Sequence, residues 1–355
     1  MNFTLFKTNI QLPALKTILC SLLCFIGIKS FGQQNSTGKM HFGIIYPLST
    51  NGTHAPLDTN TLSIHLLAGV SAAERGASFA GISNIVRNDT KGFQFAGISN
   101  HVAKQTNGGL FSGFLNTYGG GNVCAVAGFA NITNDVKGIQ IAGFINKAAN
   151  ITGPQIGGFI NKAKDIKGSQ IAGFINIAGK VKGAQIAGFI NVADSSDYPI
   201  GIINIIKNGE KSISLTTDET FTTMLSFRSG GKVLYGIIGL GYNFKNSDEV
   251  YAFEAGLGAH LFQSNSFRLN TEISGIGLES FKAGEYFKTS LRLMPAIKIT
   301  RNLEIFGGPS LNYLNTNTIE GLKLHKDYIS TWENKWGSNF QALYIGYQGG
   351  IQYIF

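Results

Sequence analysis

The sequence repeats one six-residue core at steps of 15 residues, as Ile141-Ala-Gly-Phe-Ile-Asn146, Ile156-Gly-Gly-Phe-Ile-Asn161, Ile171-Ala-Gly-Phe-Ile-Asn176 and Ile186-Ala-Gly-Phe-Ile-Asn191. Four more divergent copies precede these and end at Asn84, Asn100, Asn116 and Asn131, and a worn copy ends at Asn204. A fixed period of this kind is the signature of an architecture built from stacked repeats.

The period favours a β-solenoid in which each repeat forms one coil. A helical hairpin needs more than about 30 residues per unit, and the glycine and β-branched content opposes helix. An alternative makes each repeat one strand and turn of a wide antiparallel barrel. Adjacent antiparallel strands run in opposite directions, so identical residues would lie at opposite heights and form no ladder. In a solenoid each residue lies above its equivalent in the next coil.

Four positions of the repeat have predicted structural roles. The core glycines suit a tightly packed position where a side chain would clash: Gly143, Gly158, Gly173 and Gly188. The second glycines suit corners of the chain: Gly92, Gly138, Gly153, Gly168 and Gly183. The asparagines would form an amide ladder: Asn146, Asn161, Asn176 and Asn191. The isoleucines would fill the interior: Ile141, Ile156, Ile171 and Ile186.

The start of the chain predicts export. Lys7 and Lys16 precede the apolar run 18–28, and the small-residue end 30–32 is typical of a cleavage site. The run is shorter than the roughly 20 residues of a membrane-spanning helix. An uncleaved anchor and a lipoprotein modified at Cys24 are the alternatives, although the small residue that normally precedes a lipidated cysteine is absent. Cleavage after residue 32 would leave Cys124 without a disulfide partner.

From Ser212 onward, alternating apolar and polar residues predict a membrane-type β-barrel. The last strand ends in Phe355 and resembles the closing strand of outer-membrane barrels. A soluble β-sandwich with one wet face is the alternative. Eight strands are predicted, at 40–49, 212–228, 232–245, 250–263, 267–281, 286–300, 302–315 and 340–355. A barrel of this size is filled by side chains, and charged residues would pair inside it: Glu254, Glu272, Arg268, Lys288, Arg292 and Lys298.

The predicted chain is therefore all-β, a repeat β-solenoid joined to an antiparallel barrel of about eight strands. Its segments are a signal peptide at 1–32, a first barrel strand and linker at 33–60, about nine repeats at 61–209, and the rest of the barrel at 210–355. With strand 40–49 in the barrel, the repeats form the first connection and lie at the cell surface. The other long connection is 316–339.

No catalytic, cofactor-binding or metal site is predicted. The six histidines lack metal-ligand spacing, and the glycine run 119–121 lacks the lysine and serine of a phosphate loop. The acidic pairs 218–219 and 248–249 are interpreted as solvated. Lys137, Lys167 and Lys182 would form a basic stripe that contacts anionic glycans or lipid headgroups, or that only discourages aggregation.

The repeat G-x-Q-I-A-G-F-I-N and its continuation through 194–209 resemble a family of bacterial surface-repeat proteins, over roughly residues 60–230. The resemblance implies export and surface exposure and implies no activity. We therefore expect a non-enzymatic outer-membrane protein whose repeats serve adhesion, envelope organisation or interaction. Its expected partners are outer-membrane lipid, anionic glycans or a host or envelope protein, and not nucleic acid. A transport or channel role for the barrel is the alternative.

Overall fold

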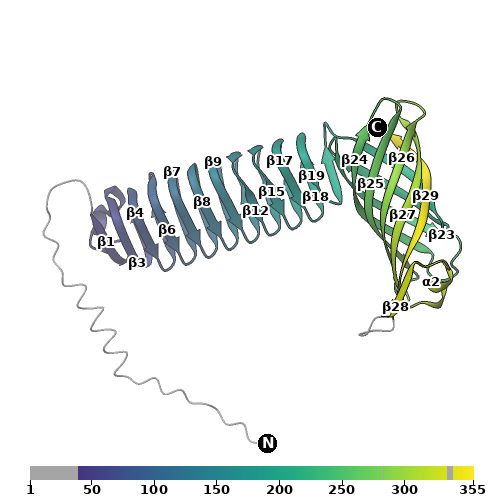
Figure 1. Cartoon of the computed structure of the whole chain (residues 1–355). Helices are drawn as coiled ribbons and strands as arrows, with labels where there is room; N and C mark the ends of the chain where they lie inside the picture. The colour runs from purple at the N-terminus through teal and green to yellow at the C-terminus, as the bar shows by residue number, and fades with distance from the viewer. Residues whose placement is uncertain (1–38, 283, 334–338) are drawn as a thin grey trace, which may run out of the picture. The chain divides into compact units, whose positions relative to one another are not determined.

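The computed structural model describes residues 39–282, 284–333 and 339–355, which form two β-sheets (Figure 1). The predicted signal peptide at 1–32 lies outside the described residues. Among the described residues, no helix has the length and apolar character needed to cross a membrane.

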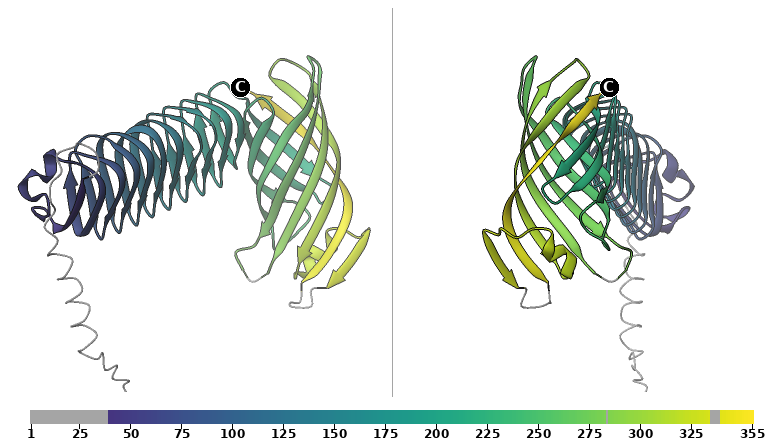
Figure 2. Two further views of the ribbon diagram at one scale, coloured as in Figure 1. Left: turned by 60° about the vertical axis from the view of Figure 1, so that its left-hand side comes forward. Right: turned by 90° about the vertical axis from the view of Figure 1, so that its right-hand side faces the viewer.

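The first sheet is a β-solenoid of about ten coils. Short strands follow one another around each coil and stack on those of the next (Figures 1 and 2). Its strands are β1 (Met40–Ile45), β2 (Leu48–Ser49), β3 (Thr59–Ser71), β4 (Ala73–Ala80), β5 (Ser83–Val86), β6 (Thr90–Ala96), β7 (Ser99–Ser112), β8 (Leu115–Ala127), β9 (Ala130–Ala142), β10 (Ile145–Lys147), β11 (Asn150–Thr152), β12 (Gln155–Gly157), β13 (Ile160–Lys162), β14 (Asp165–Lys167), β15 (Gln170–Ala172), β16 (Ile175–Ile177), β17 (Lys180–Ala187), β18 (Ile190–Ala193), β19 (Ser195–Ile200) and β20 (Ile203–Ile206). A 3-10 helix, η1 (Gly52–Leu57), precedes β3.

The coils stack in parallel and in register. β10 pairs in parallel with β13, so that Asn146 lies opposite Asn161, and β12 pairs with β15 in the same way. This parallel pairing excludes the antiparallel alternative. Equivalent residues of neighbouring coils therefore form continuous ladders, as the period predicts.

Two rows of side-chain amides run through the interior. Asn146 Nδ2 donates to Asn161 Oδ1 at 2.9 Å and to the carbonyl oxygen of Ile156 at 2.8 Å. A second row, which the sequence analysis missed, consists of glutamines, and Gln155 Nε2 donates to Gln140 Oε1 at 2.8 Å. These side chains are fully buried. Because an unpaired buried amide costs about 1–3 kcal/mol, the ladder bonds are needed to keep this polar interior stable.

The apolar part of the interior differs from the prediction. The residues that fill it are Val136, Ile151, Ile166 and Val181, together with alanines such as Ala148. The isoleucines predicted to be inside point outward, because the buried residues on either side of each, a Gln and an Ala or Gly, occupy the inward positions of the strand. These isoleucines are Ile141, Ile156, Ile171 and Ile186. Ile171, for example, is 39% exposed.

The two glycine positions have different physical causes. A Cβ atom on the core glycine Gly158 would lie 2.0 Å from the carbonyl oxygen of Gly143 in the preceding coil, so no side chain fits. The second glycine Gly153 has φ of +134°, at the corner between β11 and β12. That backbone conformation is open to glycine and strained for other residues.

The second sheet closes into an antiparallel barrel of eight strands, because β21 pairs with both β22 and β29. β28 (Ser330–Glu333) extends the sheet beside β29, and the short helix α2 (Ile319–Lys323) precedes it. The eight strands are β21 (Lys211–Asp218), β22 (Thr222–Gly230), β23 (Leu234–Asn243), β24 (Tyr251–Gln263), β25 (Phe267–Glu279), β26 (Tyr286–Lys298), β27 (Leu303–Thr316) and β29 (Phe340–Ile354).

The barrel has the predicted number of strands, but two of the assignments are corrected. The segment 40–49 is not a barrel strand, since β1 pairs in parallel with β3 and caps the solenoid. The segment 212–228 is not one strand but two, β21 and β22, which pair with each other across a turn at 219–221. The repeats therefore precede the whole barrel and are not its first connection.

This correction changes the end of the barrel at which the repeats join it. The end that carries the start of β21 and the C-terminal Phe355 also carries the three short turns at 231–233, 264–266 and 299–302. We call it the short-turn end. The opposite, far end carries the connections 219–221, 244–250, 280–285 and 317–339. The solenoid leads into the barrel at the short-turn end.

Candidate functional site

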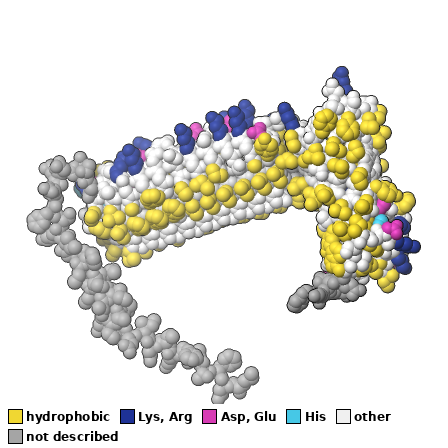
Figure 3. All heavy atoms as spheres, viewed as in Figure 1, with side chains coloured by type: hydrophobic (Ala, Val, Ile, Leu, Met, Phe, Trp, Pro, Cys, Tyr) yellow, Lys and Arg dark blue, Asp and Glu magenta, His cyan; other side chains and the backbone are white. Residues whose placement is uncertain are grey.

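The outer surface of the solenoid carries an apolar stripe. We define it as three columns that occupy equivalent outward positions in successive coils: Ile141, Ile156, Ile171 and Ile186; Phe144, Phe159, Phe174 and Phe189; and Ile145, Ile160, Ile175 and Ile190. The phenylalanine rings stack with centroids 4.9–5.2 Å apart. Figure 3 shows hydrophobic side chains forming a band along the coils. A contiguous apolar surface of this kind marks an interaction site more often than ordinary solvent exposure.

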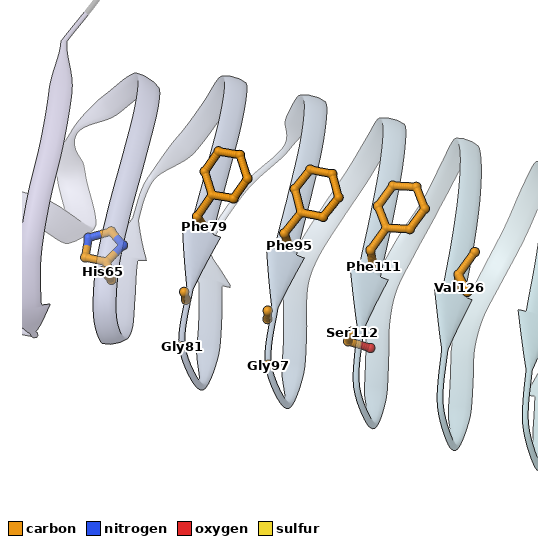
Figure 4. A pocket seen from close by; sticks show the side chains of 10 residues that line it. His65, Phe79, Gly81, Phe95, Gly97, Phe111, Ser112 and Val126 are labelled. Atoms are coloured by element: carbon orange, nitrogen blue, oxygen red, sulfur yellow. The ribbon is translucent and has the colours of Figure 1, made fainter. Parts of the chain in front are cut away.

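At the N-terminal coils the same columns border a pocket of about 400 Å³. Phe79, Phe95 and Phe111 form one wall, and the core glycines Gly81 and Gly97 lie below them (Figure 4). The rings stack in parallel with centroids 5.2 and 4.9 Å apart, so neighbouring rings partly cover one another's faces. The pocket is therefore an apolar, weakly hollowed surface without a charged lining residue.

Lysines line up beside the apolar stripe. Lys147 projects outward from β10 on the same side as Ile145, because alternate residues of a strand face the same way. In the next coil Lys162 lies directly opposite Lys147. The predicted row of Lys137, Lys167 and Lys182 also exists, interrupted by Thr152. Within the described residues none of these five lysines forms an ion pair. Figure 3 shows Lys and Arg side chains along one edge of the coils.

A buried polar cluster caps the first coils. The rings of His41 and His65 meet edge to face with centroids 4.4 Å apart. Glu74 accepts hydrogen bonds from Ser63 at 2.8 Å and from Asn60 at 3.2 Å. Burial, with His41 adding to it, lowers the pKa of His65 to about 4, and burial raises the pKa of Glu74. Both effects disfavour charge inside this cap.

The outer wall of the barrel is apolar. Its middle carries exposed aliphatic side chains, including Leu225, Leu240, Leu257, Ile273, Leu291, Ile305 and Ile351. Exposed aromatic residues lie towards both ends: Phe262, Phe267, Tyr353 and Phe355 at the short-turn end, and Tyr242, Phe244, Tyr251, Phe281 and Tyr347 at the far end. An apolar band between two aromatic girdles is typical of membrane β-barrels.

Charged residues fill the middle of the lumen. Glu272 accepts from Arg228 Nε at 2.8 Å and from the Tyr235 hydroxyl at 2.9 Å. Arg292 pairs with Glu254 at 2.6 Å. Each of these side chains is at most 5% exposed. Buried charges are tolerated when they are paired in this way.

The two ends of the lumen are filled in the same manner. Towards the short-turn end, Arg268 pairs with Glu304 and with Glu210, each at 2.7 Å. Towards the far end, Lys288 pairs with Asp218. A cavity near Arg268 measures only about 10 Å³, enough for at most about one water molecule.

Several predicted positions differ from their interpretation. Asp218 and Glu219 are not solvated: they point into the far end of the lumen, where Glu219 also accepts from Tyr344 at 3.1 Å. Glu249 is buried and accepts from Thr318 at 2.9 Å. Lys298 does not reach a lumen acid, and its Nζ lies 3.4 Å from the Ser264 carbonyl oxygen.

Two further sequence features fall inside the solenoid. The glycines 119–121 lie within β8. Cys124 is a free thiol on the same strand. Across the described residues, no group of three or more His, Cys, Asp or Glu side chains is arranged to hold a metal ion.

The last coil of the solenoid packs on the outer wall of the barrel. Arg228 and Tyr235 point into the lumen, so their neighbours Ser229 and Gly236 point outward. Ser229 and Gly236 are opposite each other on β22 and β23, and a Cβ on Gly236 would lie 2.1 Å from the carbonyl oxygen of Ile202. Ile202 therefore joins the solenoid surface to the barrel wall.

Comparison of the chain with protein-family models, with curated proteins and with solved structures found no match.

Proposed function

We propose that this chain is a non-enzymatic outer-membrane protein, in which the barrel is the membrane anchor and the solenoid is a rigid scaffold for envelope organisation. The observation that carries the proposal is the barrel wall, where an apolar band lies between two rows of exposed aromatic residues. The solenoid-plus-barrel architecture is compatible with such a protein.

The corrected topology favours the periplasmic side for the solenoid. Bacterial outer-membrane barrels have short periplasmic turns and longer extracellular loops. The repeats join this barrel at the short-turn end, and the longest connection, 317–339, lies at the far end. The expectation of surface exposure rested on strand 40–49 lying in the barrel and on the resemblance to surface-repeat proteins. Because the topological ground is lost, we propose a periplasmic solenoid in its place. Envelope organisation is then favoured over adhesion or host contact.

The alternative transport role has less support. A channel needs an open lumen, whereas this one is filled from end to end by ion pairs such as Arg292 with Glu254. Single-channel recordings of the full chain in planar bilayers test this point. Steady conductance steps that disappear in a boiled sample would support transport and contradict the scaffold proposal.

Membrane anchoring is tested by cell fractionation combined with gel mobility. Folded outer-membrane barrels stay with the membrane after carbonate washing, and we expect the same of this chain. We also expect the unheated protein to migrate differently from the boiled protein in detergent gels. Recovery of the whole chain in the soluble fraction would contradict the proposal and favour a soluble protein with the same barrel.

A further inference from the structure

The apolar stripe of the solenoid is continuous with the apolar wall of the barrel. Ile202 occupies the next position of the phenylalanine column after Phe189. The residues that follow these two, Ile190 and Ile203, lie opposite each other where β18 pairs with β20. The backbone of Ile202 packs on Gly236, an outward-facing residue of β23. Gly236 pairs across strands with Leu257, whose side chain is exposed on the wall. One apolar surface therefore runs from the barrel wall onto the coils.

The positive charges beside the stripe indicate that its partner is anionic. Lys147 and Lys162 lie side by side at the edge of the stripe and have no acidic partner among the described residues. Two aligned ammonium groups repel each other unless anions lie nearby. A surface that combines an apolar strip with two flanking lysines is complementary to an anionic lipid surface, in which hydrocarbon lies below negatively charged headgroups.

We propose that the apolar stripe is a membrane-docking surface, and that the solenoid lies along the lipid surface of the bilayer that holds the barrel. The inference rests on the proposed membrane anchoring of the barrel. Phe144, Phe159 and Phe174 enter the outer part of the acyl region, and Lys147 and Lys162 lie at the level of the headgroups. The contact of Ile202 with the barrel wall at Gly236 fixes where the docked surface begins.

Two other occupants fit the surface less well. If a second copy of the chain covered the stripe face to face with its solenoid axis antiparallel, Lys147 and Lys162 of both copies would be brought towards each other. A glycan stacks on open faces of aromatic rings, whereas the rings of Phe144, Phe159 and Phe174 stack on one another with centroids 4.9–5.0 Å apart, so that each face is partly covered by the next ring.

The test places single tryptophans in the full chain after Trp332 and Trp336 have been replaced by phenylalanine. Phe159→Trp reports on the stripe, and Thr152→Trp reports on an exposed polar position seven residues earlier, outside the stripe. Leu291→Trp reports on the barrel wall. Each protein is reconstituted into vesicles of phosphatidylcholine and phosphatidylglycerol, with or without bromine on the phosphatidylcholine acyl chains. Gel mobility and circular dichroism check that each variant is folded, and Phe174→Trp replaces Phe159→Trp if needed.

We expect brominated chains to quench Phe159→Trp to an extent similar to Leu291→Trp and to leave Thr152→Trp nearly unchanged. Replacing Lys147 and Lys162 by glutamine should reduce the quenching of Phe159→Trp. Quenching at Leu291→Trp alone would overturn the docking inference and leave the barrel proposal intact. Quenching at none of the three positions would overturn the membrane anchoring itself. A blue-shifted but unquenched Phe159→Trp would mean that protein covers the stripe, and would also overturn the inference.

Discussion

Asn204 ends the amide ladder of the solenoid on the wall of the barrel, at Ser229. Its side-chain Nδ2 donates to the carbonyl oxygen of Ser229 at 3.2 Å, and its backbone N–H donates to Ser229 Oγ at 3.0 Å. The preceding rung, Asn191, donates to Asn204 Oδ1 at 2.8 Å. The last coil thus has hydrogen-bond partners where a further coil would otherwise be needed, and the barrel serves as the C-terminal cap of the solenoid.

The small size of Gly236 is required for this cap. Gly236→Leu would place a side chain where the carbonyl oxygens of Gly201 and Ile202 lie, each 2.1 Å from a Cβ. We expect the last coil to detach from β22 and β23 while the barrel stays folded. Hydrogen exchange should then rise at 195–206, with little change in 267–298. The control Gly277→Leu has its nearest neighbouring atom 3.9 Å from a Cβ and should leave 195–206 protected. Equal protection at 195–206 in both variants would contradict this cap.

Removing one rung of the ladder should destabilise the solenoid. In Asn161→Ala, the Asn146 donor and the Asn176 acceptor each lose a buried partner. At about 1–3 kcal/mol for each of the two unpaired groups, we expect the free energy of unfolding to fall by about 2–6 kcal/mol. The exposed control Thr152→Ala should change it by less than about 0.5 kcal/mol. Urea titration followed by circular dichroism compares the two, and equal midpoints would show that the ladder contributes little.

The lumen should depend on the charge of Glu272. Glu272→Gln removes the carboxylate that faces Arg228 and Arg292 and leaves two guanidinium groups with less compensation. Breaking a buried ion pair in this way costs about 3–5 kcal/mol. Glu279→Gln, on the exposed end of the same strand, is the control. The temperature at which the unheated gel band disappears should drop for the first variant only. An unchanged transition in both would contradict the structural role of the lumen pairs.

The cap of the first coils should lose stability in acid. The folded-state pKa of His65 is about 4, below its ordinary value of 6.5, so the folded state favours the neutral ring. Neutral His65 makes its full contribution to the free energy of unfolding above pH 6.5. As the pH falls from 6.5 towards 4, a loss of about 3 kcal/mol is expected. The raised pKa of Glu74 acts in the opposite sense, so the measurement is made in Glu74→Gln. Rate-corrected hydrogen exchange of 59–80 should rise between pH 7 and pH 5. In the further variant His65→Asn, that rise should be smaller. An equal rise in both proteins would assign the effect to other groups.

Periodicity predicted the solenoid, because stacking requires identical residues at identical positions. It did not predict which apolar residues face inward. Ile141 and Ile151 are alike in hydropathy, and the orientation of each depends on where the corners at Gly143 and Gly153 fall. The buried row of glutamines that includes Gln140 was not predicted. A polar side chain is expected inside only when a hydrogen-bond partner is known, and here the partner is the equivalent glutamine of the next coil.

The barrel shows a different limit of sequence patterns. Apolar and polar residues alternate in β1 as they do in a barrel strand, but β1 pairs with the solenoid strand β3. The alternation of a strand shows that it has two different faces and does not show which strand it pairs with. The turn between β21 and β22 contains Thr220 and Phe221 and no glycine or proline, so the sequence gives no turn signal there. Counting 40–49 as a barrel strand added one strand, and counting 212–228 as a single strand removed one, so the total of eight was still correct. Together these two errors placed the repeats at the wrong end of the barrel.

The most direct test of the central claim is cysteine labelling of intact cells with a membrane-impermeant maleimide. In a Cys124→Ala background, Thr152→Cys marks the solenoid and Ile319→Cys marks α2 at the far end of the barrel. The background protein without an added cysteine is the control for labelling. An outer-membrane barrel with a periplasmic solenoid predicts that Ile319→Cys is labelled in intact cells and Thr152→Cys only after the outer membrane is permeabilised. Labelling of Thr152→Cys in intact cells, with Ile319→Cys protected, would contradict this account and place the solenoid on the cell surface.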